Sequence, residues 1–341
     1  MRAKVQVVRP VIWMVGLLLP LASGAQGLKA ITVAPPGSKP AADFSTLQDA
    51  VTAAPESGAE IRIRPGTYRE VVHIDKPNIR LIGETSDAAQ VTIVDDMGDP
   101  KTCGTFCSPT MFVTGDGFFA AHLTISNDLS KTGKVRTQGV ALSITSDRAV
   151  LRDVRLLGAQ DTLYAASKSC RGETPCRVSR QYFDHCYIEG EVDFIFGNSK
   201  AVFHDCEIHS ITHAAGGYLT AQSRNKPEED SGYVIDHCRL TADAGVGNVY
   251  LGRPWRDYAT VTYLNTEMGA HIAAAGWSEW HQGDTERLKT ASYAEFNSTG
   301  PGAHKGEREP LSKQLTAAEA KQYETKTWLA GSDGWDATVV K

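Results

Sequence analysis

A short apolar pattern recurs along the middle of the chain and limits the folds open to it. Each copy holds three apolar residues spaced +3 and then +2, with polar residues in the gaps and turn residues afterwards. The copies are Ala120/Leu123/Ile125, Leu151/Val154/Leu156, Phe183/Cys186/Ile188, Phe203/Cys206/Ile208 and Ile235/Cys238/Leu240. They begin 31, 32, 20 and 32 residues apart. Each copy is too short for a helix and ends with the period of two that is typical of strands, so the repeat predicts a solenoid with loop insertions.

A solenoid that stacks each strand on its equivalent in the next turn is a parallel β-helix. We therefore predict an all-β fold with a single domain over residues 26–341, and coils from Ile61 to about Trp280. Short helices should cap the solenoid at its N-terminal end and pack along it in the C-terminal segment. Capping boxes at 45–48 and 316–319 predict an N-terminal helix to Ala54 and a C-terminal helix to about Leu329.

The first 25 residues have the features of a secretory signal peptide. A basic start precedes an apolar run from Val11 to Leu21, and small residues lead to Ala25. A membrane anchor is the alternative, but the run is short for a bilayer. We expect cleavage before Gln26 and a secreted, extracellular mature protein.

Charge argues against two classes of partner. Without its basic leader the chain's formal net charge of −5 becomes −8, because residues 1–25 contain no Asp or Glu. An acidic surface does not suit nucleic acid, and no later segment is apolar enough for a membrane. Any polyanionic ligand must therefore be held by local contacts.

All seven cysteines lie after the leader, which suits an oxidising compartment. The pairs Cys103/Cys107 and Cys170/Cys176 lie in loop-like segments, and we expect disulfides there. Zinc ligation is the alternative, but the usual C-x2-C spacing and paired histidines are missing. One further pair is open: Cys186 and Cys206 occupy the same repeat position about 4.8 Å apart, so they either form a disulfide or belong to a ladder of buried thiols with Cys238.

The repeat register brings two aspartates together. Asp161 lies ten residues after Leu151, and Asp193 lies ten residues after Phe183, with no insertion between either aspartate and its triplet. Both should emerge at one place on neighbouring coils, about 5 Å apart at the backbone. Such carboxylates interact strongly, and different surroundings can divide them into an acid and a base or nucleophile. A structural pair that binds a cation or caps turns is the alternative.

Residues near this pair suit acyl transfer. Gln160 precedes Asp161, and Gln138 lies one coil earlier; an amide N–H can donate to a developing oxyanion. Arg253 can hold a carboxylate through two hydrogen bonds, and the Trp255 ring suits a sugar. Taken singly, either glutamine could be a routine polar residue, and Trp255 could belong to the core.

Three segments of the chain resemble signature segments of pectin methylesterases. They are Gly158-Ala-Gln-Asp-Thr-Leu-Tyr164, Gly190-Glu-Val-Asp-Phe-Ile-Phe-Gly197 and Leu251-Gly-Arg-Pro-Trp255. Weaker likenesses are Gly66-Thr-Tyr68, Thr105-Phe-Cys-Ser-Pro-Thr110 and Gln138-Gly-Val-Ala-Leu142. All occur in family order between about Phe44 and Trp335. Thr137 and Gly139 depart from the usual His and Ala of the family.

The resemblance implies a right-handed parallel β-helix and a role for each matching residue. Asp193 matches the nucleophile, and Asp161 matches the acid that protonates methanol and then activates water. Gln160 and Gln138 match groups that stabilise the oxyanion, Gln138 also touching substrate. The matching substrate-binding residues are Arg253, which also holds the nucleophile, Trp255 at the sugar, and Thr105. No metal and no cofactor is implied.

The expected activity is therefore de-esterification of pectin to pectate and methanol by a monomer, with no nucleic-acid or membrane partner. A β-helix hydrolase or lyase of polygalacturonan is the nearest alternative, because close Asp pairs also serve retaining glycosidases. Methanol release would distinguish the esterase from enzymes that create new reducing ends. Action on another ester or thioester, or a non-catalytic carbohydrate-binding solenoid, are the remaining alternatives.

Overall fold

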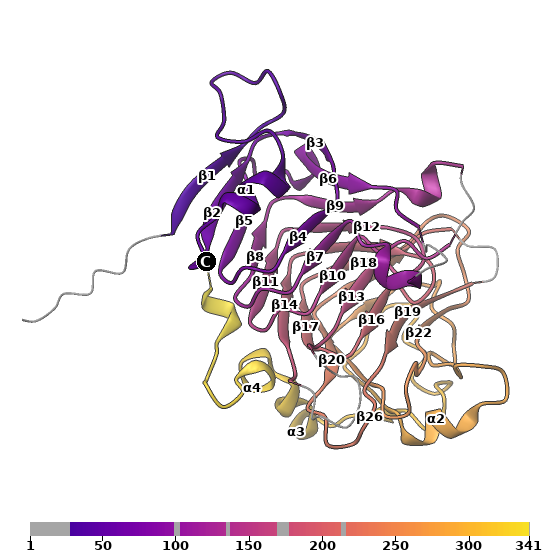
Figure 1. The fold of residues 1–341 in the computed structure, drawn as a ribbon. Coiled ribbons are helices and arrows are strands. Elements are labelled where there is room, and N and C mark those ends of the chain that lie inside the picture. Colours follow the sequence, from indigo (N-terminus) through magenta and orange to yellow (C-terminus); the bar gives the residue numbers. More distant parts are fainter. Residues whose placement is uncertain (1–27, 99–102, 134–136, 169–176, 213–215, 341) are drawn as a thin grey trace, which may run out of the picture.

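The computed structural model describes residues 28–98, 103–133, 137–168, 177–212 and 216–340. The predicted leader and the Cys170/Cys176 pair lie outside these residues. Within them the chain winds into the predicted right-handed parallel β-helix, whose strands form three sheets (Figure 1). Successive coils contribute one strand to each sheet, and all the paired strands run parallel.

The largest sheet has eleven strands. In spatial order they are β1 (Lys29–Val33), β2 (Ala59–Ile63), β5 (Ile79–Gly83), β8 (Phe119–Ala121), β11 (Ala149–Arg152), β14 (Arg180–Asp184), β17 (Lys200–His204), β20 (Gly232–Asp236), β23 (Thr260–Leu264), β25 (Ser292–Phe296) and β26 (Lys313–Gln314). The eight-stranded sheet contains β24 (Glu267–Met268), β21 (Arg239–Ala242), β18 (Glu207–Ser210), β15 (Tyr187–Gly190), β12 (Arg155–Leu157), β9 (Thr124–Asn127), β6 (Val91–Asp95) and β3 (Gly66–Arg69). The seven-stranded sheet contains β22 (Val249–Gly252), β19 (Gly217–Gln222), β16 (Ile195–Gly197), β13 (Leu163–Ala165), β10 (Leu142–Ile144), β7 (Met111–Val113) and β4 (Val72–Ile74).

The apolar triplets stack in the predicted register. Leu151 pairs with Ala120 on one side and with Phe183 on the other, and Phe183 pairs in turn with Phe203. The last members of the triplets stack in the same way in the eight-stranded sheet, where Leu156 pairs with Ile188. All members of the five triplets are buried in one cluster that fills the solenoid.

The spacing of +3 within each triplet has a conformational cause. The polar residue before each middle member takes a left-handed backbone, with φ between 51° and 56°. These residues are His122, Asp153, His185, Asp205 and His237. Asp, Asn and His enter this region more readily than most residues, so they form the corner where the chain leaves the eleven-stranded sheet for the eight-stranded one. The corner adds one residue between the two strands, so the next buried residue follows after three positions and not after two.

The cysteine predictions have mixed outcomes. Cys103 and Cys107 form a disulfide, as predicted. Cys186, Cys206 and Cys238 are free and buried, so the direct bridge between the first two is wrong and the ladder of thiols is confirmed. Two of the sulfurs accept backbone hydrogen bonds from the preceding coil instead: the Cys186 N–H donates to the Cys206 sulfur at 3.4 Å, and the Cys206 N–H donates to the Cys238 sulfur at 3.3 Å.

The solenoid is longer than its repeat suggests. Its first strand, β1, precedes the predicted start at Ile61, and β25 follows the predicted end at Trp280. Both bounds were wrong because these coils lack the apolar triplet. At the N-terminal end, α1 (Leu47–Ala53) begins after an N-cap at Thr46 rather than Ser45.

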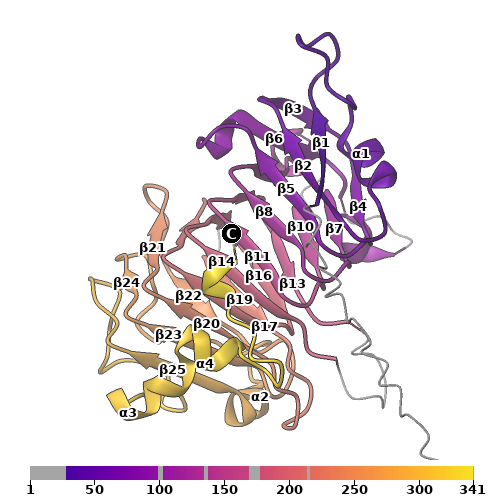
Figure 2. The same cartoon turned by 90° about the vertical axis from the view of Figure 1, so that its left-hand side faces the viewer.

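The C-terminal helix is broken into short pieces rather than continuous. Thr316 and Glu319 form the predicted capping box, but α3 (Ala317–Ala320) gives way to a 3-10 turn before α4 (Thr325–Leu329). These pieces lie across the outer face of the eleven-stranded sheet (Figure 2). There Leu329 packs in a cluster with Val202 and Val234, so the predicted packing along the solenoid is confirmed.

A further short helix is α2 (Thr285–Thr290). Among the described residues, none of the helices has the length and apolar character needed to cross a bilayer.

Candidate active site

The two predicted catalytic aspartates lie at the entry to the seven-stranded sheet. Asp161 precedes β13 by two residues and Asp193 precedes β16 by two. Residues beside them pair in register: Gln160 forms a parallel bridge with Val192, and the Asp161 N–H donates to the Val192 carbonyl at 3.1 Å. Both aspartates also have a left-handed backbone, with φ of 64° and 50°. Identical conformations on stacked coils place both carboxylates on the same face.

A close turn sets this geometry in each coil. Three residues before each aspartate stands a glycine, Gly158 or Gly190, and the residue after the aspartate folds back against it. A Cβ on Gly158 would lie 2.6 Å from the Thr162 hydroxyl, and one on Gly190 would lie 2.2 Å from Cβ of Phe194. The two turns therefore require glycine at the same repeat position, which explains why Gly and Asp recur at one spacing.

Arg253 holds Asp193 through two hydrogen bonds. Its Nε donates to Oδ1 at 2.9 Å and its Nη2 to Oδ2 at 2.7 Å. Arg253 follows β22, which is two coils beyond β16, and its side chain crosses the intervening coil. On that coil the centre of the Tyr218 ring lies 3.9 Å from the guanidinium carbon. The Trp280 ring, from a later coil, lies 4.4 Å from the same carbon. Two aromatic rings thus help to fix the fork on the carboxylate.

The surroundings of the pair set its charge. Asp193 is 6% exposed. Burial raises the pKa of the Asp193 carboxyl, against the opposing hydrogen bonds and charge of Arg253. Burial also acts to lower the pKa of Arg253, but contact with Asp193 outweighs it and raises that pKa above its usual range. Asp161, by contrast, is partly exposed, so the two carboxyls have different environments.

The two glutamines lie on neighbouring coils. Gln160 directly precedes Asp161, and the Gly139 N–H donates to the Gln160 carbonyl at 3.2 Å, which places Gln138 one coil earlier. Both are partly exposed. The glycine that departs from the family pattern at 139 has a local reason, since a Cβ there would lie 2.7 Å from Oδ1 of Asn127.

A row of aromatic rings lines this face of the seven-stranded sheet. Neighbouring ring centroids are 4.9 to 6.5 Å apart along the series Phe106, Tyr164, Phe196, Trp255 and Trp280. Trp255 packs in this outer cluster and not in the main core. Phe106 and Thr105 belong to one 3-10 turn (Gly104–Cys107), which the Cys103–Cys107 disulfide closes. The predicted threonine is therefore brought to the aromatic row by its neighbour.

Tyr164, Phe196, Tyr218 and Trp280 are site residues that the sequence alone did not predict. The first two carried a usable signal, because they are 32 residues apart like the aspartates and pair directly across β13 and β16. Tyr218 and Trp280 had no comparable mark. Their place beside Arg253 depends on three different coils.

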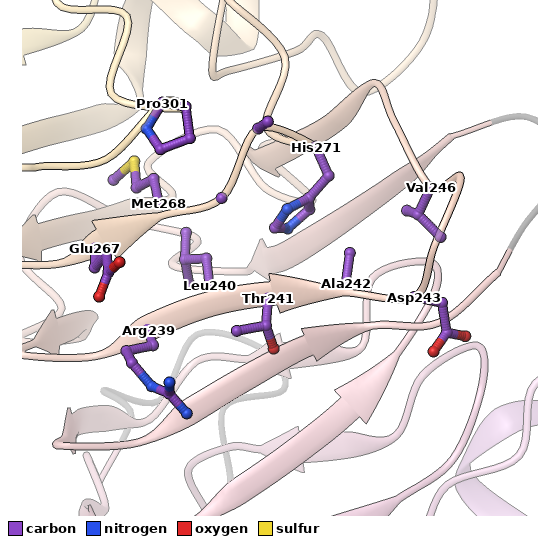
Figure 3. A pocket seen from close by; sticks show the side chains of 12 residues that line it. Arg239, Leu240, Thr241, Ala242, Asp243, Val246, Glu267, Met268, His271 and Pro301 are labelled. Carbon is purple, nitrogen blue, oxygen red and sulfur yellow. The ribbon is translucent and has the colours of Figure 1, made fainter.

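One hollow lies beside this site, and a second hollow and a group of possible metal ligands lie elsewhere. A hollow of about 520 Å³ adjoins it and is lined by Tyr218, Arg253 and Trp280. Another, of about 410 Å³, lies between β21 and β24 of the eight-stranded sheet and includes His271 (Figure 3). Within the described part of the chain, three side chains able to share a metal ion converge only at His204, Asp236 and His237.

Comparisons with known proteins agree with this architecture. The model of the pectinesterase family matches residues 30–332. Pectinesterase QRT1 of Arabidopsis thaliana is 37% identical over 305 residues, which is 86% of this chain and 76% of that protein. The carrot pectin methylesterase structure superposes with a TM-score of 0.81 at 31% identity, covering 93% of this chain and 98% of that one. A pectin methylesterase in complex with a hexasaccharide gives a TM-score of 0.74 at 29% identity, covering 91% and 98%. This chain belongs to the pectinesterase family.

Proposed function

We propose that this pectinesterase hydrolyses the methyl esters of pectin with Asp193 as nucleophile and Asp161 as acid and then base. One observation carries the assignment: a buried aspartate is held at both oxygens by Arg253 and stands in register with a second, more exposed aspartate. Arg253 orients Asp193 and keeps it ionised against the effect of burial. Asp161, which has more access to solvent, is suited to exchange protons.

The first half of the reaction forms an acyl-enzyme. A carboxylate oxygen of Asp193 attacks the carbonyl carbon of the C6 methyl ester, and the negative charge moves to the carbonyl oxygen. The side-chain amides of Gln160 and Gln138 donate hydrogen bonds to that oxyanion. As the intermediate collapses, neutral Asp161 gives its proton to the departing methoxide, so methanol leaves and an anhydride remains on Asp193.

The second half restores the enzyme. Asp161 is now a carboxylate and takes a proton from a water molecule, whose oxygen attacks the acyl carbon of the anhydride. Asp193 leaves as a carboxylate and the galacturonate carboxyl is released. Asp161 is again protonated, ready for the next ester.

The aromatic row binds the polysaccharide. An acidic protein gives no general attraction for a polyanion, so recognition depends on contacts made at the site. The rings of Trp255 and Tyr164, with the buried Phe196 ring between them, offer apolar surface for sugars, and Thr105 offers a hydroxyl group. These groups flank the aspartates over several coils, a length that suits a chain of sugar residues.

We also propose that the mature enzyme is secreted. Residues 1–25 have the composition of a signal peptide, and the Cys103–Cys107 disulfide fits an oxidising compartment. Extracellular pectin would then be accessible to it.

The decisive experiment incubates residues 26–341 with highly methylated pectin and follows methanol and new reducing ends in parallel. We expect methanol to form with no increase in reducing ends above the level with an Asp193→Ala control. An increase in reducing ends without methanol would instead support cleavage of the polysaccharide backbone and overturn the proposal.

A further inference from the structure

Carboxylates and imidazoles alternate along one corner of the solenoid, between the eleven- and eight-stranded sheets. Consecutive coils end their strands with Asp184-His185, His204-Asp205 and Asp236-His237. The register pairs Asp184 with His204 and His204 with Asp236. Because the order of the two residue types reverses at each step, every imidazole has carboxylates beside it. We call these six residues the corner ladder.

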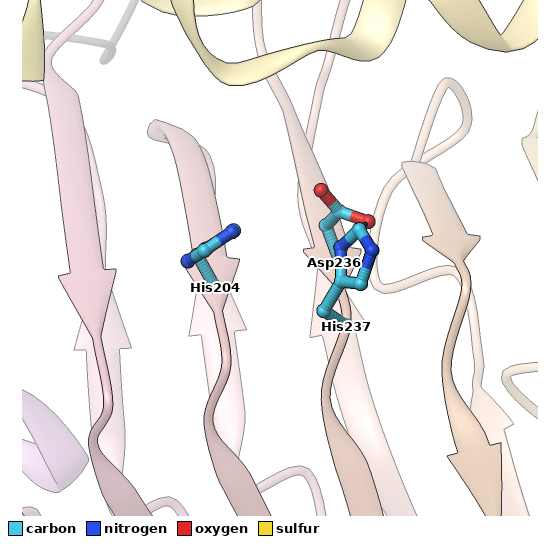
Figure 4. Close-up of side chains that lie close together, drawn as sticks. All are labelled: His204, Asp236 and His237. Carbon is cyan, nitrogen blue, oxygen red and sulfur yellow. Dashed lines mark ion pairs between the residues drawn. The ribbon is translucent and has the colours of Figure 1, made fainter. Parts of the chain in front are cut away.

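Three members of the corner ladder converge. His204 stands at the end of β17, and Asp236 and His237 stand at the end of β20, the neighbouring strand (Figure 4). One ligand atom from each lies within 4.8 Å of the other two. Zinc is bound by imidazole nitrogen and carboxylate oxygen at about 2.0–2.2 Å, so small side-chain rotations would bring all three atoms onto one ion.

A carboxylate behind His204 favours this use of the ring. Nδ1 of His204 lies 3.4 Å from Oδ1 of Asp184, which is buried and also held by Arg152. A carboxylate that accepts the Nδ1 proton fixes the ring and leaves the Nε2 lone pair for a metal. Histidines that bind metals are commonly oriented by a carboxylate in this way.

The Asp236 side chain is oriented as well. Its Oδ1 lies 2.8 Å from Nδ1 of His237 and accepts a hydrogen bond from the Asn265 amide at 3.0 Å. These contacts engage Oδ1 of Asp236 and Nδ1 of His237, so Oδ2 of Asp236 and Nε2 of His237 are the atoms that we assign to the ion. The charge of the corner ladder also favours a cation, because the ladder contains three carboxylates and its histidines are neutral when they bind a metal.

We propose that His204, Asp236 and His237 form a binding site for a divalent transition metal such as Zn²⁺, completed by water. Two imidazoles with one carboxylate are a ligand set that suits zinc, nickel or copper and not magnesium or calcium. The site is remote from catalysis, because the aspartate pair belongs to the seven-stranded sheet. Bound metal would tie β17 to β20 and stabilise the folded state, since an ion that binds the native state alone raises its stability.

The test uses residues 26–341 without a polyhistidine tag, stripped of metal by chelator. Titration with ZnCl2 is followed by calorimetry, and the thermal midpoint is measured in parallel. We expect saturable binding of one ion per chain and a thermal midpoint that rises with zinc concentration. If no saturable binding occurs, or if zinc leaves the midpoint unchanged, the site does not exist.

Matched variants locate the ion. His237→Gln should lower zinc affinity by at least about tenfold, and Asp184→Asn should lower it by about 10- to 100-fold through the orientation of His204. His185→Gln is the control, because its side chain has nearly the same exposure as that of His237, 57% against 54%, and belongs to the ladder without joining the converging trio. His185 contacts Asp184 at 2.9 Å, and the glutamine amide keeps a hydrogen-bond donor for that carboxylate. The zinc affinity of this control should stay unchanged. Equal losses in His185→Gln and His237→Gln would refute the assigned ligands, and both exposed positions allow the test even if a buried variant fails to fold.

Discussion

Arg253→Lys separates the charge of the arginine from its geometry. In the structure one guanidinium reaches both oxygens of Asp193, at 2.9 and 2.7 Å. Lysine keeps the positive charge but offers a compact ammonium group that cannot form the planar fork. It also loses the flat surface that lies over Tyr218. Asp193 would keep a counter-ion and lose its fixed orientation.

The size of the effect follows from the lost contact. A hydrogen bond to a charged group contributes about 1.5–3 kcal/mol, so the loss of one lowers kcat/KM by roughly 10- to 100-fold, given that about 1.4 kcal/mol is a factor of ten. The pKa of Asp193 is already raised by burial, and Arg253 opposes that effect. A weaker partner lets this pKa rise further.

The sign of the pH effect follows from the role proposed for Asp193. The nucleophile must be ionised, so activity is lost as pH falls through its pKa in the free enzyme. A higher pKa moves that acid-side limb of the kcat/KM profile to higher pH in Arg253→Lys. Methanol release from highly methylated pectin, measured across the acid range for both enzymes, gives the two limbs.

A control and a refuting outcome complete the experiment. Trp255→Ala should raise KM through weaker sugar binding and leave the acid limb where it is. If Arg253→Lys instead shows an unshifted profile and only a raised KM, Arg253 binds a substrate carboxylate and does not position Asp193.

Four further outcomes are expected. Asp193→Ala and Asp161→Asn should each nearly abolish turnover while circular dichroism stays native; substantial activity in either would disprove its role. Gln160→Ala should lower kcat by about 10²–10³, the usual cost of one lost oxyanion donor, whereas a change confined to KM would mark a binding residue. Methanol release should survive EDTA, because no step of the proposed reaction uses a metal. Phe203→Ala, which empties a fully buried position stacked on Phe183 at 4.6 Å, should lower the free energy of unfolding by about 3–5 kcal/mol in denaturant titrations.

The fold could be predicted from the sequence where the apolar triplet repeats, and it could not be predicted where the triplet is missing. The triplet of Phe183, Cys186 and Ile188 has one strand on each side of a corner, so its spacing carries both the strands and the bend. The end coils lack that triplet. Their strands, β1 and β25, belong to the solenoid because each pairs in parallel with a strand of the neighbouring coil, β2 and β23 respectively. That neighbouring coil provides the register that the sequences of β1 and β25 do not show by themselves.

The site residues also divide into those that the repeat predicts and those that it does not. Asp161 and Asp193 could be paired from sequence because each keeps a constant distance from its own triplet, and the register carries that distance into space. No such count predicts that Arg253, sixty residues after Asp193, reaches it. The motif resemblance suggested the contact. The physical cause is that β22 stacks two coils beyond β16, within reach of a long side chain.

The stacking of equivalent residues on neighbouring coils therefore produces both polar clusters, the corner ladder and the pair of Asp161 and Asp193. The chemistry of each cluster depends on the residues around it. Asp, Asn and His take a left-handed corner conformation more readily than most residues, and stacking then brings these groups together whether or not they react. In the corner ladder each carboxylate has an imidazole partner, so charge is matched locally and a metal ion is the natural ligand. At the seven-stranded sheet Asp193 has burial on one side and Arg253 on the other, while Asp161 keeps access to solvent. That asymmetry, and not the stacking alone, suits two identical residues to the different roles proposed for them in one reaction.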